Sequence, residues 1–212
     1  MWIDSGVTIS THISKVVAGC FVILRQLRSI HQSLTQATLT RLVVSLVLTH
    51  VDYCNSVLTG LPLSQLNRPQ AVINAEARLI LSGRRRDHIT PLLMQLHWLR
   101  VPEKIEYKLC VLVYRCLHGM APEYLACSLQ RVSDVTTWRH LRSAATSQLV
   151  IPVTRCLTLG DRAFPVAAAR AWNALPHSVS SASTLLIFRR LLKHIYSIAA
   201  FIRSFIPSFM YF

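Results

Sequence analysis

The carboxylates of this chain are too scattered for two-metal chemistry, which needs paired acidic residues close to both ions. The acidic residues are Asp4, Asp52, Asp87, Asp134, Asp161, Glu76, Glu103, Glu106 and Glu123. No two aspartates are adjacent. Glu103 and Glu106 fall one helical turn apart, but Lys104 and Lys108 beside them indicate a solvated ion-pair face. We therefore expect no catalytic residue here.

Cysteine and histidine spacing argues against zinc. Cys110 and Cys116 lie on an apolar stretch near His118, and no second paired cluster follows at the distance seen in zinc fingers. Free cysteines on such a stretch are usually small buried hydrophobes. The chain also lacks a glycine-flanked serine and a glycine-rich phosphate loop. We expect neither a metal nor another cofactor.

The positive signals are groups of basic residues. They comprise Arg84, Arg85 and Arg86; Arg139 and Arg142; and Arg189, Arg190 and Lys193. The middle group lies beside Trp138 and His140. Basic side chains contact phosphates, and planar ones stack on exposed bases. A solvated basic face explains each group about equally well, so the choice depends on the charge of the whole chain.

That charge favours a polyanion. The chain has 212 residues, enough for one sizeable domain or two small ones, and a net charge of +14. RNA, DNA or their hybrid is the usual partner, and an anionic membrane is the rival. Hydrophobic residues make up 52% of the chain, so some apolar surface is expected to pack against a further segment, subunit or membrane. The 6 scattered cysteines favour a reducing compartment, nucleus or cytoplasm.

Apolar residues recur at helical spacing through most of the chain, which predicts a mainly α fold. The expected helices cover residues 10–30, 35–53, 63–81, 90–96, 102–117, 163–175 and 183–205. Pro69 should kink or shorten the third helix, and Thr90 should cap the fourth with Pro91 at its first position. Residues 133–146 read as loop, and two β-branched runs within residues 148–159 predict one small hairpin.

Several blocks of the chain, taken in order, resemble one family. The blocks are DYCNSVL and GLP within residues 52–62, NAEARLI at 74–80, HITPLL and LHWLRV within 88–101, YRCLHGMAPEYL at 114–125, RHLRS at 139–143, GDRAF at 160–164, AWNALP at 171–176 and STLLIFRRLL at 183–192. Together they resemble the region that follows the polymerase palm in reverse transcriptases of non-LTR, LINE-type retrotransposons, the jockey-like group among them. The first block is highly specific.

The resemblance implies a position within that enzyme. Residues 1–82 would hold the end of the palm or connection and the first thumb helices, and residues 83–132 the helical thumb. Residues 133–160 would form the loop and hairpin, and residues 161–212 the C-terminal helices with a divergent apolar tail. The metal-binding aspartates of the family lie upstream, so this chain is expected to be catalytically incomplete, although the full-length enzyme uses magnesium. A thumb-like bundle would retain sequence-independent grip on primer and template.

Some positions depart from the family pattern, and another class of function stays open. Pro69, Ala168 and Ala169 replace residues more usual in the family, and the tail after about Ile195 matches no pattern, which suggests a degenerate element. The alternative is a helical protein-interaction or membrane-associated module that uses its apolar faces and the tail over residues 195–212.

Overall fold

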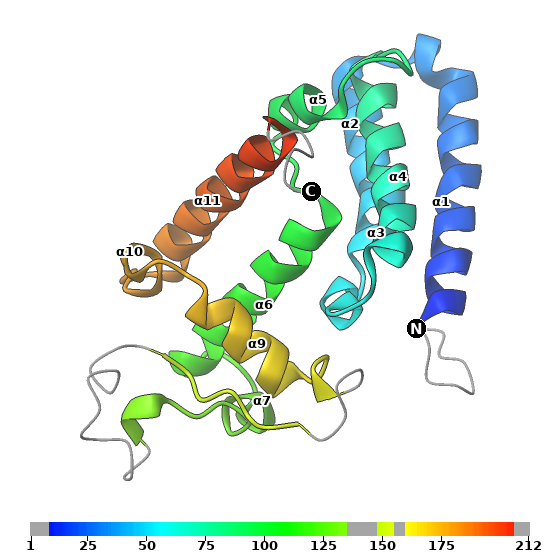
Figure 1. The fold of residues 1–212 in the computed structure, drawn as a ribbon. Coiled ribbons are helices and arrows are strands. Elements are labelled where there is room, and N and C mark those ends of the chain that lie inside the picture. The colour runs from blue at the N-terminus through cyan, green and yellow to red at the C-terminus, as the bar shows by residue number, and fades with distance from the viewer. Residues whose placement is uncertain (1–8, 135–147, 155–159, 206–212) are drawn as a thin grey trace, which may run out of the picture. The chain divides into compact units, whose positions relative to one another are not determined.

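The computed structural model describes residues 9–134, 148–154 and 160–205, and for residues 199–205 the backbone alone. Helices dominate these residues, so the predicted mainly α class is confirmed (Figure 1). The chain divides into two compact units. The first unit comprises Met1–Lys104 and Ser197–Phe212, and the second comprises Ile105–Tyr196.

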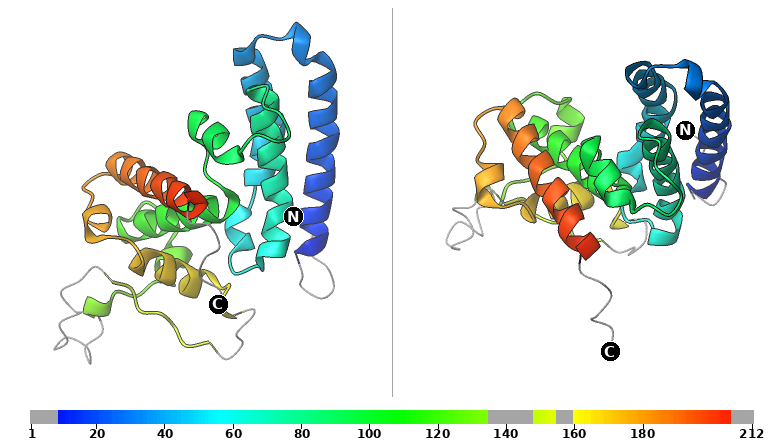
Figure 2. Two further views of the ribbon diagram at one scale, coloured as in Figure 1. Left: turned by 45° about the horizontal axis from the view of Figure 1, so that its top comes forward. Right: turned by 90° about the horizontal axis from the view of Figure 1, so that it is seen from above.

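The first unit is built on three long helical segments. These are α1, Ser10–Ile30; α2, Gln36–Val43; and α4, Leu63–Ile80. A π-helical turn at Val44–Leu48 continues α2 into the short α3, Thr49–Asp52. α1 and α4 lie side by side, with α2 also against α4 (Figures 1 and 2).

Apolar spacing determines which face of α1 is buried. Ile13, Cys20, Leu24 and Leu27 recur at helical intervals and are all buried, whereas Arg28 is exposed. The turn between α1 and α2 is the short 3-10 helix His31–Ser33, and α2 then begins at a side-chain cap. There Thr35 Oγ1 accepts a hydrogen bond from the Thr38 amide at 3.3 Å.

The second unit contains the greater part of α6, Val101–Leu117, and of α11, Leu185–Phe205. The shorter helices are α7, Glu123–Ala126; α9, Phe164–Asn173; and α10, His177–Ser180. Its core is aromatic: Phe188 stacks on Tyr114 with ring centroids 4.6 Å apart and lies 5.7 Å from the ring of Trp172. The Tyr114 hydroxyl donates to the Ala182 carbonyl at 3.0 Å, which satisfies its buried polar atom.

The structure corrects the predicted shortening of the third helix at Pro69 and the predicted start of the fourth at Thr90 and Pro91. α4 begins at Leu63 and continues past Pro69, which is buried, so its first turns are not lost. α5, Ile89–Gln95, begins before Thr90, with His88 as the N-cap and no side-chain capping bond. Thr90 Oγ1 instead accepts a hydrogen bond from Arg100 Nη2 at 2.8 Å. Pro91 is tolerated because it lies in the first turn of α5, where amides lack a helical acceptor in any case. Pro69 lies beyond the first turn of α4 and has no amide to donate within that helix.

The described part of the expected hairpin pairs with a different segment. Leu149 forms an isolated antiparallel bridge with Arg131, and Val150 donates its amide to the Gln130 carbonyl at 2.8 Å. On the other side, the Asn173 side chain accepts from the Leu149 amide and donates to its carbonyl, both at 2.8 Å. A side-chain amide thus completes the pairing of Leu149. Residues 155–159, the other half of the expected hairpin, lie outside the described residues.

Candidate nucleic-acid interface

A cleft of about 560 Å³ opens at one edge of the first unit. Its lining residues are Arg28, His31, Ala71, Ala75, Arg78, Leu79, Ser82, Gly83 and Arg85. None of these residues is acidic, and the two alanines lie one helical turn apart on α4. The volume falls within the range of roughly 300–1,000 Å³ that is usual for ligand sites. We call it the basic cleft.

Parallel packing of α1 and α4 creates this edge. The two helices run in the same direction, so their C-terminal ends lie at the same end of the unit (Figure 1). Arg28 and Arg78 occupy the last turns of these helices. Gln36 Nε2, at the start of α2, donates a hydrogen bond to the Ile80 carbonyl at 3.5 Å. This bond fixes the start of α2 to the same end of the unit.

The chain leaves α4 through a tight turn that directs Arg85 into the cleft. Ser82 has a left-handed φ of +53°, and the Gly83 amide donates to the Arg78 carbonyl at 2.9 Å, as in a Schellman motif. A Cβ on Gly83 would lie 2.9 Å from Leu92 Cδ1, so glycine allows the close approach of α5. Asp87 then accepts the Arg84 amide through Oδ2 at 2.6 Å and closes the turn.

The predicted arginine triplet divides at this turn. Arg84, Arg85 and Arg86 are all exposed, but only Arg85 lines the basic cleft. Arg78 also lines the cleft, and its Nε is buried and makes no hydrogen bond among the described residues. Its Nη2 donates to the Asp87 carbonyl at 3.3 Å, which orients the guanidinium. Planar guanidinium groups converging on one cavity suit bidentate contact with phosphate oxygens.

The remaining predicted residues do not join this cleft. Arg189, Arg190 and Lys193 are exposed on α11 in the second unit. Burial raises the pKa of the Tyr107 phenol, while the charge and hydrogen bond of Arg189 lower it, so Arg189 already has a protein partner. Arg139 and Arg142 lie outside the described residues.

Comparisons with known protein families, curated proteins and solved structures found no match.

Sequence reasoning missed Arg28, His31 and Arg78 as members of the site. Arg28 and Arg78 are separated by fifty residues, and each alone is an ordinary cation at a helix C-terminus, where the helix dipole favours positive charge. A sign was nevertheless present in the sequence, since both arginines fall in the last turns of two predicted helices. What the sequence lacked was the parallel pairing of those helices.

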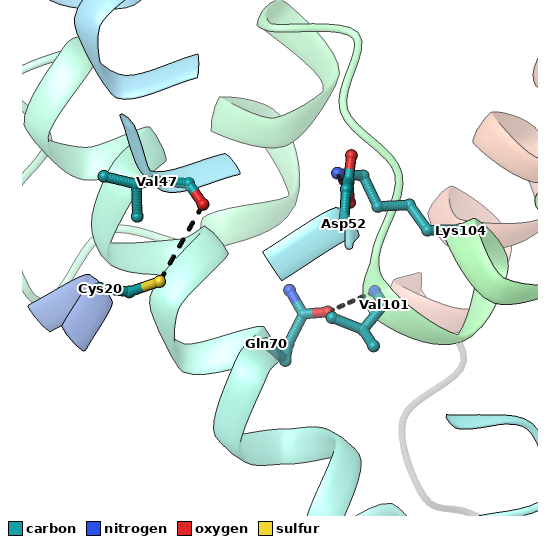
Figure 3. Close-up of polar contacts among 6 residues, drawn as sticks. All are labelled: Cys20, Val47, Asp52, Gln70, Val101 and Lys104. Carbon is teal, nitrogen blue, oxygen red and sulfur yellow. Dashed lines mark hydrogen bonds and ion pairs between the residues drawn. The ribbon is translucent and has the colours of Figure 1, made fainter. Parts of the chain in front are cut away.

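A second polar cluster lies inside the first unit and corrects the expected ion-pair face. Glu103 is buried, and Lys104 bonds to Asp52 of α3 at 2.9 Å (Figure 3), so neither residue belongs to a solvated face. Of the other two residues of that face, Glu106 is exposed and Lys108 is half-buried. Gln70 of α4 accepts the Val101 amide at 2.8 Å nearby. The α6 start is thereby held to α3 and α4.

Glu76 of α4 completes this cluster. Its side chain is fully buried, and burial raises its pKa to about 8, with Lys104 acting to lower it and Asp52 to raise it. The carboxyl group is therefore largely neutral at pH 7. Its two oxygens make no hydrogen bond among the described residues. Glu76 also belongs to no group of metal-ligating side chains in the described part of the chain.

The buried thiols are unreactive. Burial raises the pKa of Cys20 to about 11, and Glu76 adds to this; burial likewise raises the pKa of Cys110 to about 12. Cys20 Sγ lies 4.0 Å from the Val47 carbonyl oxygen (Figure 3), and Cys110 Sγ lies 3.7 Å from the Tyr196 hydroxyl. Because the thiolate is the nucleophile, neither cysteine is suited to catalysis. Within the described residues, no group of three or more metal-ligating side chains comes together.

Proposed function

We propose that this chain is a non-catalytic part of a non-LTR retrotransposon reverse transcriptase that binds the phosphates of RNA, DNA or their hybrid, without reading sequence, at the basic cleft. The observation that carries the proposal is the convergence of Arg28, Arg78 and Arg85 on one cavity whose lining residues include no acid. Such a site neutralises phosphates and offers no array of base-reading side chains.

The resemblance in sequence supports the family part of the proposal. The NAEARLI block contains Arg78 of the cleft, and the block beginning HITPLL follows directly after the arginine turn. The matching blocks thus include or flank the cleft residues of α4 and of the turn after it, whereas Arg28 and His31 precede the first block. The net charge of +14 supports the choice of a polyanionic ligand.

The test compares two arginines of the same turn. Arg85→Ala removes a cleft residue, whereas Arg86→Ala removes the same charge from a neighbour outside the cleft lining. Binding of a labelled RNA–DNA hybrid is measured by fluorescence anisotropy over a salt series. We expect Arg85→Ala to weaken binding severalfold and to reduce the slope of log K against log salt by about 0.9, with a smaller change for Arg86→Ala.

Equal effects of the two substitutions would refute the cleft, because binding would then follow the charge of the whole surface. A strong preference among hybrids of unrelated sequence would refute sequence-independent recognition. The non-catalytic part has its own test: primer extension by the purified chain with magnesium should show no incorporation, and measurable incorporation would overturn it.

A further inference from the structure

The exposed side of α11 combines an apolar stripe with a basic one. Phe188, Leu192 and Tyr196 form the buried face of the helix. Away from that face, Ile187, Leu191 and Ile198 are 44%, 37% and 45% exposed. Their spacing of four and seven residues places them in one line along the helix. We call these three residues the α11 stripe.

Basic side chains border this stripe on the solvent side. Arg190 and Lys193 are both exposed. At about 100° per residue Arg190 lies roughly 80° from the middle of the stripe, whereas Lys193 lies roughly 140° from it, on the far flank of the helix. His194 falls between them and the stripe and is also exposed. The helix Leu185–Phe205 contains no aspartate or glutamate. Its outer face therefore presents apolar and cationic groups together, with no carboxylate of its own to repel an anionic surface.

We propose that this face of α11 docks on an anionic lipid bilayer, with the α11 stripe in the headgroup boundary and Arg190, which flanks the stripe, on lipid phosphates. Nucleic-acid phosphates would use only the basic half of the face, whereas an anionic bilayer offers both negative charge and hydrocarbon. The face is one side of a single helix and so is convex, which suits a flat surface better than a peptide that needs a groove.

The length of the α11 stripe favours a helix that lies in the plane of the bilayer surface. From Ile187 to Ile198 the stripe extends about 16 Å at 1.5 Å per residue, well short of the roughly 30 Å hydrocarbon core. No described helix is long and apolar enough to cross a membrane. Helices that bind in the interfacial plane combine a basic polar face with an apolar face, as α11 does.

The test separates this stripe from the general positive charge of the protein. The full chain is sedimented with vesicles of phosphatidylcholine alone or mixed with phosphatidylserine, at low and high salt. The stripe variant Ile187→Ser/Leu191→Ser/Ile198→Ser keeps all charges. A matched variant, Val22→Ser/Val44→Ser/Leu46→Ser, removes side chains of the first unit that are 52%, 36% and 41% exposed. Circular dichroism checks that both variants keep their helices.

We expect the stripe variant to lose about tenfold in partition onto phosphatidylserine vesicles, most clearly at high salt, while the matched variant stays near wild type. Arg190→Gln should lower partition at low salt more than Lys193→Gln, which removes the same charge from the flank of α11 farther from the stripe. Hybrid binding by the stripe variant should be unchanged, so this proposal and the cleft can fail separately.

Equal partition of the stripe and matched variants would overturn the proposal. So would equal binding to neutral and anionic vesicles, because the basic border would then have no role. If the wild type self-associates in sedimentation velocity and only the stripe variant is monomeric, with vesicle binding unaffected, the occupant is a second protein chain and the lipid surface is rejected.

Discussion

The two units bury different kinds of side chain. The interior of the first holds ionisable groups: Glu76 is fully buried, and the Asp52–Lys104 pair lies beside it. The interior of the second is held by stacked rings, with Tyr114, Trp172 and Phe188 each no more than 3% exposed. Apolar burial is nearly independent of pH, whereas a buried acid with a raised pKa makes folding depend on protons.

This difference means that the same perturbation should affect the two units differently. A change in pH acts on the first unit through Glu76, and loss of an aromatic ring acts on the second through its packing. Hydrogen exchange resolved by segment distinguishes the units, because it reports the opening free energy of each region separately.

The largest effect is expected from Phe188→Ala. This substitution removes a fully buried ring that packs on Tyr114 and Trp172, and it should destabilise the second unit by about 3–5 kcal/mol. Amides of α6 and α9 in that unit should lose protection in hydrogen exchange. The control is Ile187→Ala on the same helix, whose side chain is 44% exposed and whose loss should matter little for folding. Equal loss of protection in α1 and α4 would mean that the units unfold together.

A smaller effect should follow from raising the pH. The pKa of Glu76 rises from 4.5 in the unfolded chain to about 8 in the folded one, chiefly through burial. The folded state therefore binds the proton more tightly, so the stability contribution is complete below pH 4.5 and is lost as pH rises toward 8. Between pH 6 and 8 the first unit should lose up to about 3 kcal/mol, at 1.36 kcal/mol per unit of pKa. Protection of α4 amides, corrected for the intrinsic pH dependence of exchange, measures this loss.

Glu76→Gln provides the decisive variant for this titration. The amide keeps the shape of a protonated carboxyl group and cannot ionise, so the pH dependence in this range should flatten. Glu123→Gln, at an exposed site in α7, is the matched control and should retain the wild-type profile. A Glu76→Gln protein with an unchanged profile would assign the titration to another group.

Helix positions followed from the sequence more readily than the residues between helices did. The apolar spacing placed α1 at residues 10–30, because a one-sided stripe of that length can only be buried as a helix. Arg85 was recognised as part of a basic run, but its separation from Arg84 and Arg86 depends on the left-handed turn at Ser82, an uncommon conformation for serine. Burial of Glu76 was equally hidden, since glutamate is rarely buried without a partner.

The smallest effect concerns the ion pair that borders Glu76. Asp52→Asn removes the charge that bonds to Lys104 at 2.9 Å, in a pair whose side chains are 30% and 13% exposed. Partly exposed pairs of this kind contribute about 1 kcal/mol or less, so the first unit should be only slightly less stable near pH 6. Thermal melts followed by circular dichroism measure that loss, with Asp134→Asn, at an exposed site of the second unit, as the control.

The same substitution should have a second consequence. Asp52 acts to raise the pKa of Glu76 and Lys104 acts to lower it, so neutralising Asp52 and freeing Lys104 should both move the pKa of Glu76 downward. The pH-dependent loss of α4 protection in Asp52→Asn should then level off at a lower pH than in the wild type, although the protein has lost an ion pair. An unchanged pH midpoint would show that the Asp52–Lys104 pair does not influence the pKa of Glu76. Glu76 would then be an isolated buried acid in the first unit.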